Sequence, residues 1–218
     1  MRVLGIDPGL TRCGIGVIEG QPGRTPSLLL ADVVRTPPDM ETGQRLAAVE
    51  RMLVQMVAEY RPDALAVERV FARRDVSSII GTAQASGVVL LVGTRAGLSV
   101  AQHTPTEVKA AITGNGRADK AQVGQMVMRI LDLDAPPKPA DAADAVALAV
   151  CHLWRAPALA RLAQAQVRRE LAEGRVRART LAARRARGTQ SVGTQSVGTQ
   201  SVGTVGTRAA GTQNRSTA

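Results

Sequence analysis

Four acidic residues stand at positions where acids contribute little to folding. Asp7 ends the apolar run RVLGID, and Glu68 lies inside the otherwise apolar run ALAVERVF. Asp141 and Asp144 are three residues apart, so a helix would present them on one face, and their segment is otherwise almost entirely Ala, Val and Leu. If the strands of Asp7 and Glu68 are neighbours, we expect all four carboxylates to gather at one edge of a sheet.

Each acid alone also has an ordinary structural explanation. Asp7 precedes Pro8 and Gly9, and all three residue types favour turns. Glu68 could be the exposed alternate residue of a half-buried strand. Acids in the first turn of a helix interact with its dipole by about 0.3–1 kcal/mol. The combination of all four is harder to explain, because such a cluster would repel itself unless a cation neutralised it.

An all-oxygen ligand set selects a hard ion such as Mg²⁺ or Mn²⁺, and the two His and two isolated Cys of the chain argue against zinc. Two such ions about 4 Å apart would activate a water and stabilise the leaving oxygen of a phosphodiester. We therefore expect hydrolytic phosphoryl transfer. Asp7 would hold the first ion with Asp141 and Asp144, and Glu68 would bridge toward the second.

The elements that must position these acids follow from hydrophobic periodicity and turn signals. Helical spacing is clearest in residues 41–60 and 121–131. The order predicts an α/β fold with a mixed five-stranded sheet, antiparallel in its first half and parallel in its second, with helices on its faces. The predicted strands are 2–7, 13–20, 28–36, 63–71 and 98–105, and the other predicted helices are 76–97, 106–114 and 141–154.

Composition predicts one folded domain and an extension. The 218 residues are 44% hydrophobic, which is enough for a core in residues 1–156. Residues 157–187 are rich in Ala, Arg and Leu and could continue as a helix interrupted at Gly174. Residues 188–218 begin with three GTQSV repeats, which predict a disordered tail.

The net charge of +10 is concentrated at the C-terminal end. From Arg161 onward the chain has eleven Arg, no Lys and two Glu. This excess belongs to the C-terminal extension and is by itself weak evidence for a polyanionic partner, for which the extension would add nonspecific affinity. Cys13 and Cys151 are predicted to be reduced packing residues. No signal peptide is recognisable, and the longest apolar run, residues 87–93, is too short to span a membrane, so a cytoplasmic location is predicted.

Four motifs in this order and spacing resemble the RuvC family of bacterial Holliday junction resolvases. They are GIDPGLTRCGIGV, AVERVF, GNGRADKAQV and DAADAVALAVCH, and the resemblance covers residues 1–156. It implies an RNase H-like fold and a homodimer that nicks two strands of a four-way DNA junction symmetrically with Mg²⁺, in cooperation with the RuvA–RuvB branch-migration machine. It places the catalytic carboxylates at Asp7, Glu68, Asp141 and Asp144.

The resemblance also implies roles for one aromatic residue and two lysines. Phe71 matches the family's aromatic after the glutamate and is implied to stack on bases near the crossover, an interaction of about 1–3 kcal/mol. Alternatively, Phe71 closes the core at a strand end. Lys109 and Lys120 match basic positions near the active site, and Lys120, beside the loop at 114–116, could approach the scissile phosphate. An exposed surface lysine is the commoner case for either.

Further basic residues are predicted to contact the DNA backbone in a salt-sensitive, sequence-independent way. They are Arg73, Arg74 and Arg117, each of which is equally explained as a solvated surface residue. His103 and His152 are predicted to be non-catalytic, since neither has a partner at the spacing of a metal site or catalytic triad.

Two other functions are compatible with parts of the sequence. Actin-like ATPases and sugar kinases share the strand, Asp, x, Gly, strand pattern of GIDPGLTRCGIGV, but they need two lobes and a second phosphate loop. A non-catalytic junction-binding protein would keep the scaffold without the chemistry. The intact set of four carboxylates speaks against the latter.

Overall fold

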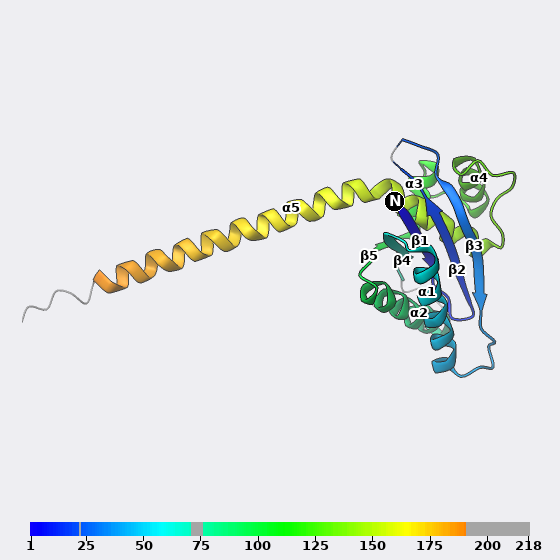
Figure 1. The fold of residues 1–218 in the computed structure, drawn as a ribbon, viewed down its shortest axis with the longest axis horizontal. Coiled ribbons are helices and arrows are strands. Elements are labelled where there is room, and N and C mark those ends of the chain that lie inside the picture. Colours follow the sequence, from blue (N-terminus) through cyan, green and yellow to red (C-terminus); the bar gives the residue numbers. More distant parts are fainter. Residues whose placement is uncertain (22, 71–75, 191–218) are drawn as a thin grey trace, which may run out of the picture. The chain divides into compact units, whose positions relative to one another are not determined.

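A computed structural model describes residues 1–21, 23–70 and 76–190. The chain divides into two compact units, Met1–Ala163 and Gln164–Ala218. Phe71, Arg73 and Arg74 lie outside the described residues. The described elements are β1 (Arg2–Asp7), β2 (Arg12–Glu19), β3 (Ser27–Arg35), α1 (Thr42–Tyr60), β4 (Ala64–Glu68), α2 (Val76–Arg95), β5 (Ser99–His103), α3 (Pro105–Thr113), α4 (Lys120–Ile130) and α5 (Ala140–Gln190) (Figure 1).

The strands form one mixed sheet in the order β3-β2-β1-β4-β5. β1 pairs antiparallel with β2, as β2 does with β3, whereas β1 and β4, and β4 and β5, are parallel. The predicted mixed sheet is therefore confirmed, including the adjacency of the strands that carry Asp7 and Glu68. β4 is shorter than predicted and ends at Glu68 rather than at residue 71.

Strand alternation gives the sheet two apolar faces, because successive side chains point to opposite sides. Leu4, Ile6 and Val67 face a core formed with α1 and α2. Val3 and Ala66 face a second core formed with α3, α4 and α5 (Figure 1). Asp7 continues the alternation of Val3 and is thereby directed to the second face, the side covered by α5.

Glycines let the backbone of α5 approach the sheet directly. Gly5 and Gly16 are register partners on β1 and β2. A Cβ atom on Gly16 would lie 2.6 Å from the backbone nitrogen of Val146, and one on Gly5 would lie 2.9 Å from that of Ala149. A Cβ on Gly14 would overlap the carbonyl oxygen of Asp141. No larger residue fits at these positions unless α5 moves away.

A buried arginine fixes the turn between β1 and β2. Arg45 on α1 donates from Nε to Thr36 Oγ1 at 2.9 Å and from Nη2 to Thr11 Oγ1 at 2.6 Å. Thr36 Oγ1 in turn donates to the carbonyl of Leu10 at 2.5 Å. The loop that follows Asp7 is therefore attached to α1 through side chains whose polar groups are satisfied.

Burial of both cysteines agrees with the prediction of reduced packing residues. Cys13 and Cys151 are free and buried. Burial raises the pKa of the Cys13 thiol to about 12 and that of Cys151 to about 11. Neither thiol is a reactive nucleophile at neutral pH.

Helix α5 is longer than predicted, and the predicted interruption at Gly174 is wrong. It runs from Ala140 to Gln190 and includes Pro157. A helical glycine costs only about 1 kcal/mol relative to Ala, and the neighbours of Gly174 are strong helix formers. By length and hydropathy residues 140–180 could span a membrane, but half of the qualifying window is buried within the fold, as in the core helix of a globular domain.

We predict that Gly16→Ala lowers the free energy of unfolding by about 1–3 kcal/mol, because the new methyl group would displace α5 from the sheet. Urea denaturation monitored by circular dichroism measures the change. Gly43→Ala is the matched control, since a Cβ there meets nothing within 4 Å. Equal urea midpoints for the two variants would contradict the close approach of α5.

Candidate active site

Two of the predicted catalytic acids lie side by side at the carboxyl ends of parallel strands. Ile6 pairs with Val67, and Asp7 and Glu68 each follow by one residue. Alternation directs both side chains to the face covered by α5, opposite to Ile6 and Val67. The strand pattern thus explains why a polar residue ends each buried strand at the same edge of the sheet.

Helix α5 brings the other two acids to this edge. Asp141 and Asp144 lie in its first two turns, and each is half-buried in an ion pair. Arg12 Nε lies 2.5 Å from Asp141 Oδ2, and Lys120 Nζ lies 2.6 Å from Asp144 Oδ2. Arg12 begins β2, and Lys120 is the first residue of α4.

Local structure explains how Lys120 reaches the acids. Asp119 caps the N-terminus of α4, accepting a hydrogen bond from the backbone of Gln122 at 2.8 Å, while the Gln122 side chain accepts one from Asp119 N at 3.0 Å. This capping box fixes where the helix begins. Lys120 then starts the helix at the mouth of the site, with its ammonium on Asp144.

Asp7, Glu68 and Asp144 line a single cavity of about 330 Å³. Asp141 is not among its lining residues, but it lies one turn from Asp144. The predicted lysines both contribute to the wall. The remaining lining residues are Pro105, Val108, Lys109, Lys120, Val123, Ala147 and Leu148.

The cavity carries more negative charge than its two cations offset. Burial is the largest cause that raises the pKa of Asp7, and together with the neighbouring charges of Glu68, Asp144 and Asp141, against an opposing effect of Lys120, it brings that pKa to about 7. The hydrogen bond to Asp144 raises the pKa of Lys120 above its usual value, so Lys120 remains an ammonium. A buried acid with a pKa this perturbed is typical of a functional site.

The donor set fits a hard divalent cation, because every acidic ligand offers carboxylate oxygen and an added positive charge would relieve the electrostatic strain at Asp7. As placed, however, no group of three or more His, Cys, Asp or Glu side chains in the described ranges is close enough to hold a metal ion. Asp141 and Asp144 are instead turned to Arg12 and Lys120. Metal ligation by the four acids therefore stays a prediction.

The two predicted DNA-binding residues that the structure describes lie in different places. Lys109 lies in the cavity wall, whereas Arg117 is exposed in the loop before α4, where its backbone N–H donates to Asn115 Oδ1 at 3.0 Å. Phosphate contacts by either residue stay predictions. Phe71, Arg73 and Arg74 cannot be placed, since they lie outside the described residues.

Sequence reasoning missed Arg12 and the pairing of the histidines. Arg12 occurs in the first motif, five residues after Asp7, and its partner Asp141 lies 129 residues further along the chain, on α5. His103 and His152 do have a partner, namely each other, at 3.1 Å. Their separation of 49 residues gave no local signal.

The family profile described as "Crossover junction endodeoxyribonuclease RuvC" matches residues 3–152, which contain all four acids. The chain belongs to the RuvC family. The crossover junction endodeoxyribonuclease RuvC of Streptomyces avermitilis is 64% identical over 165 residues, which cover 76% of this chain and 94% of that protein.

Solved structures of the RuvC family agree with the fold. RuvC of Thermus thermophilus is 36% identical with a TM-score of 0.67, covering 72% of this chain and 96% of that one. The same protein in complex with a Holliday junction substrate gives a TM-score of 0.69 at 36% identity, over 72% of this chain and 94% of that one. The predicted RNase H-like fold is confirmed.

We predict that, in EDTA, the free energy of unfolding of the parent falls relative to that of Asp7→Asn as the pH rises from about 4 to about 7. The comparison cancels the opposite contribution of the buried His103 and His152, whose lowered pKa values are common to both proteins. The pKa of Asp7 is raised in the folded state from 3.8 to about 7. The folded protein therefore holds the proton more tightly than the unfolded chain, and the associated stability, up to about 4 kcal/mol, is lost as Asp7 ionises. Urea denaturation at intervals across this range measures the slope.

Asp7→Asn removes the Asp7 contribution, because the amide does not titrate, so its free energy of unfolding should fall less, or rise more, over this pH range than that of the parent. Asp39→Asn, which alters an exposed carboxylate, should keep the parental slope. Adding Mg²⁺ at pH 8 should restore stability to the parent but not to Asp7→Asn. Parallel slopes for the parent and Asp7→Asn would show that Asp7 is not the buried acid described here.

Proposed function

We propose that this chain is a structure-selective endonuclease that resolves Holliday junctions during DNA recombination and repair, by symmetric nicking of two strands. The observation that carries the proposal is the cavity that joins Asp7, Glu68 and Asp144 with two lysines. The acids can hold divalent cations, and the lysines beside them can neutralise the negative charge of a phosphodiester. The relative from T. thermophilus, solved with a Holliday junction substrate, supports the choice of junction DNA.

The family is one of metal-dependent nucleases, and we propose Mg²⁺, with Mn²⁺ as a substitute, as the metal of this chain. Asp7, Glu68, Asp141 and Asp144 are the residues that would hold it. When bound, such ions supply an activated water and stabilise the oxygen that leaves. The acids would orient these ions toward the reacting phosphate.

The lysines and exposed basic residues have complementary roles in this proposal. Lys120 would donate to a nonbridging oxygen of the scissile phosphate, and Lys109 would extend the positive wall of the cavity. Arg117, Arg73 and Arg74 contact the DNA backbone. Phe71 stacks on a base near the crossover.

We propose a homodimer, because two active sites related by symmetry would nick two strands at symmetric positions. We propose that the dimer works in the cytoplasm with the RuvA and RuvB branch-migration complex. The Arg-rich residues from 164 onward add sequence-independent contacts with DNA, since the described arginines of this segment are exposed.

We predict that the purified chain with Mg²⁺ converts a synthetic mobile four-way junction into two nicked duplexes, with paired nicks at symmetric positions. Asp7→Asn should bind the junction with parental affinity and lower the nicking rate by at least about 10³-fold, because it removes a negatively charged ligand. Denaturing gels of end-labelled strands measure nicking, and mobility shifts in Ca²⁺ measure binding.

Linear duplex of the same sequence and Asp39→Asn serve as controls for structure selectivity and for a surface carboxylate. Tight junction binding by the parent without nicks would favour the non-catalytic binding protein. ATP hydrolysis without DNA would favour the actin-like or sugar-kinase alternative.

A further inference from the structure

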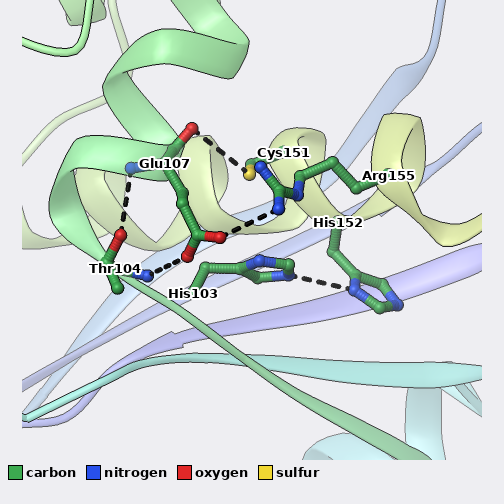
Figure 2. Close-up of polar contacts among 6 residues, drawn as sticks. All are labelled: His103, Thr104, Glu107, Cys151, His152 and Arg155. Atoms are coloured by element: carbon green, nitrogen blue, oxygen red, sulfur yellow. Dashed lines mark hydrogen bonds and ion pairs between the residues drawn. The ribbon is translucent and has the colours of Figure 1, made fainter. Parts of the chain in front are cut away.

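A polar cluster connects β5, α3 and α5 next to the active site. Figure 2 shows its members pointing toward one another from these three elements and from Thr104, the N-cap of α3. The cluster lies outside the cavity lining, and the proposed chemistry does not use it. It consists of His103, Thr104, Glu107, Cys151, His152 and Arg155.

The two histidines form its most buried contact. His103 Nε2 lies 3.1 Å from His152 Nδ1, and the ring centroids are 5.3 Å apart. The residues are 2% and 3% exposed. Burial lowers the pKa of both rings, that of His152 to about 4. Both are therefore neutral, so one ring donates and the other accepts a hydrogen bond.

This contact connects the strand next to Glu68 with the helix that carries Asp144. His103 is the register partner of Glu68 in the β4–β5 ladder, and its carbonyl accepts a hydrogen bond from Arg69 N at 2.8 Å. His152 lies eight residues after Asp144 on α5, about 12 Å along a helix. The histidine pair therefore links the backbone at Glu68 to the helix that carries Asp144.

A second connection attaches α3 to the same part of α5. Glu107 accepts hydrogen bonds from Thr104 N at 2.8 Å and from Arg155 Nη2 at 2.9 Å (Figure 2). The residues that follow on α3, Val108 and Lys109, line the catalytic cavity. The cluster thus also supports one wall of that cavity.

We propose that His103 and His152 are positioning residues, whose hydrogen bond sets the distance between Glu68 and Asp144 that metal binding and nicking require. The proposal rests on the proposed function of the cavity. It explains why an unreactive pair of neutral imidazoles is buried beside a cluster of acids, where an apolar pair would pack without needing a specific tautomer. A displacement of about 1 Å at a catalytic group can lower the rate by about 100-fold.

The test compares two substitutions at each histidine. His152→Leu removes the bond, whereas His152→Asn keeps a polar atom near the position of Nδ1. His103→Leu and His103→Gln form the corresponding pair, since glutamine places its amide near the position of Nε2. Trp154→Leu, at a residue 46% exposed on the same helix, is the control for a nearby change.

For the leucine variants we expect kcat for junction nicking to fall about 10- to 100-fold, with junction affinity in Ca²⁺ within about twofold of the parent. The rise in Tm on adding Mn²⁺ should shrink, which tests metal positioning without measuring activity. His152→Asn and His103→Gln should recover most of kcat and of the Mn²⁺ response. Trp154→Leu should match the parent.

Leucine variants that are less stable but keep parental kcat and Mn²⁺ response would overturn the proposal, since the pair would then only stabilise the fold. Equal defects in the polar and leucine variants would also overturn it. If the parent itself does not nick junctions, the proposed function fails instead, and the Mn²⁺ response of Tm still decides the positioning role. If one leucine variant does not fold, the variant at the other histidine removes the same bond.

Discussion

The direct backbone contact between α5 and the sheet is the constraint on which the rest of the site depends. It exists because Gly5 and Gly16 pair on β1 and β2, where any side chain would collide with the helix backbone. The contact brings the start of α5 over the ends of the strands, so that Asp144 shares a cavity with Asp7. Glycine is needed here because the helix backbone approaches the strands closely, not because the backbone angles are unusual.

Bringing the carboxylates close together causes electrostatic repulsion, which the fold offsets only in part. Arg12 and Lys120 neutralise Asp141 and Asp144 at the rim, whereas Asp7 lies deeper and keeps a raised pKa. Functional sites commonly hold such unfavourable charge, which a ligand or metal then relieves. In this view the ion pairs hold the helix acids in place until a cation competes for them.

Most of the strands and helices could be predicted from the sequence, and so could the four candidate acids, because both leave local signals. Alternation predicts the strands, and an acid that interrupts an apolar run, such as Glu68, is conspicuous. Contacts between distant segments leave no such signal, which explains why Arg12 and the pairing of His103 with His152 were missed. The continuation of α5 through Gly174 was mispredicted for a different reason, since one weak helix residue is outweighed by its neighbours.

Anomalous diffraction from crystals of the full chain soaked in Mn²⁺ tests most directly whether these acids bind a metal. We expect at least one Mn²⁺ ion in the cavity, bound directly by carboxylate oxygens of Asp7 and Glu68, with Asp144 turned away from Lys120. Ordered Mn²⁺ elsewhere on the protein, with the cavity free of metal and the Lys120–Asp144 ion pair intact, would contradict it.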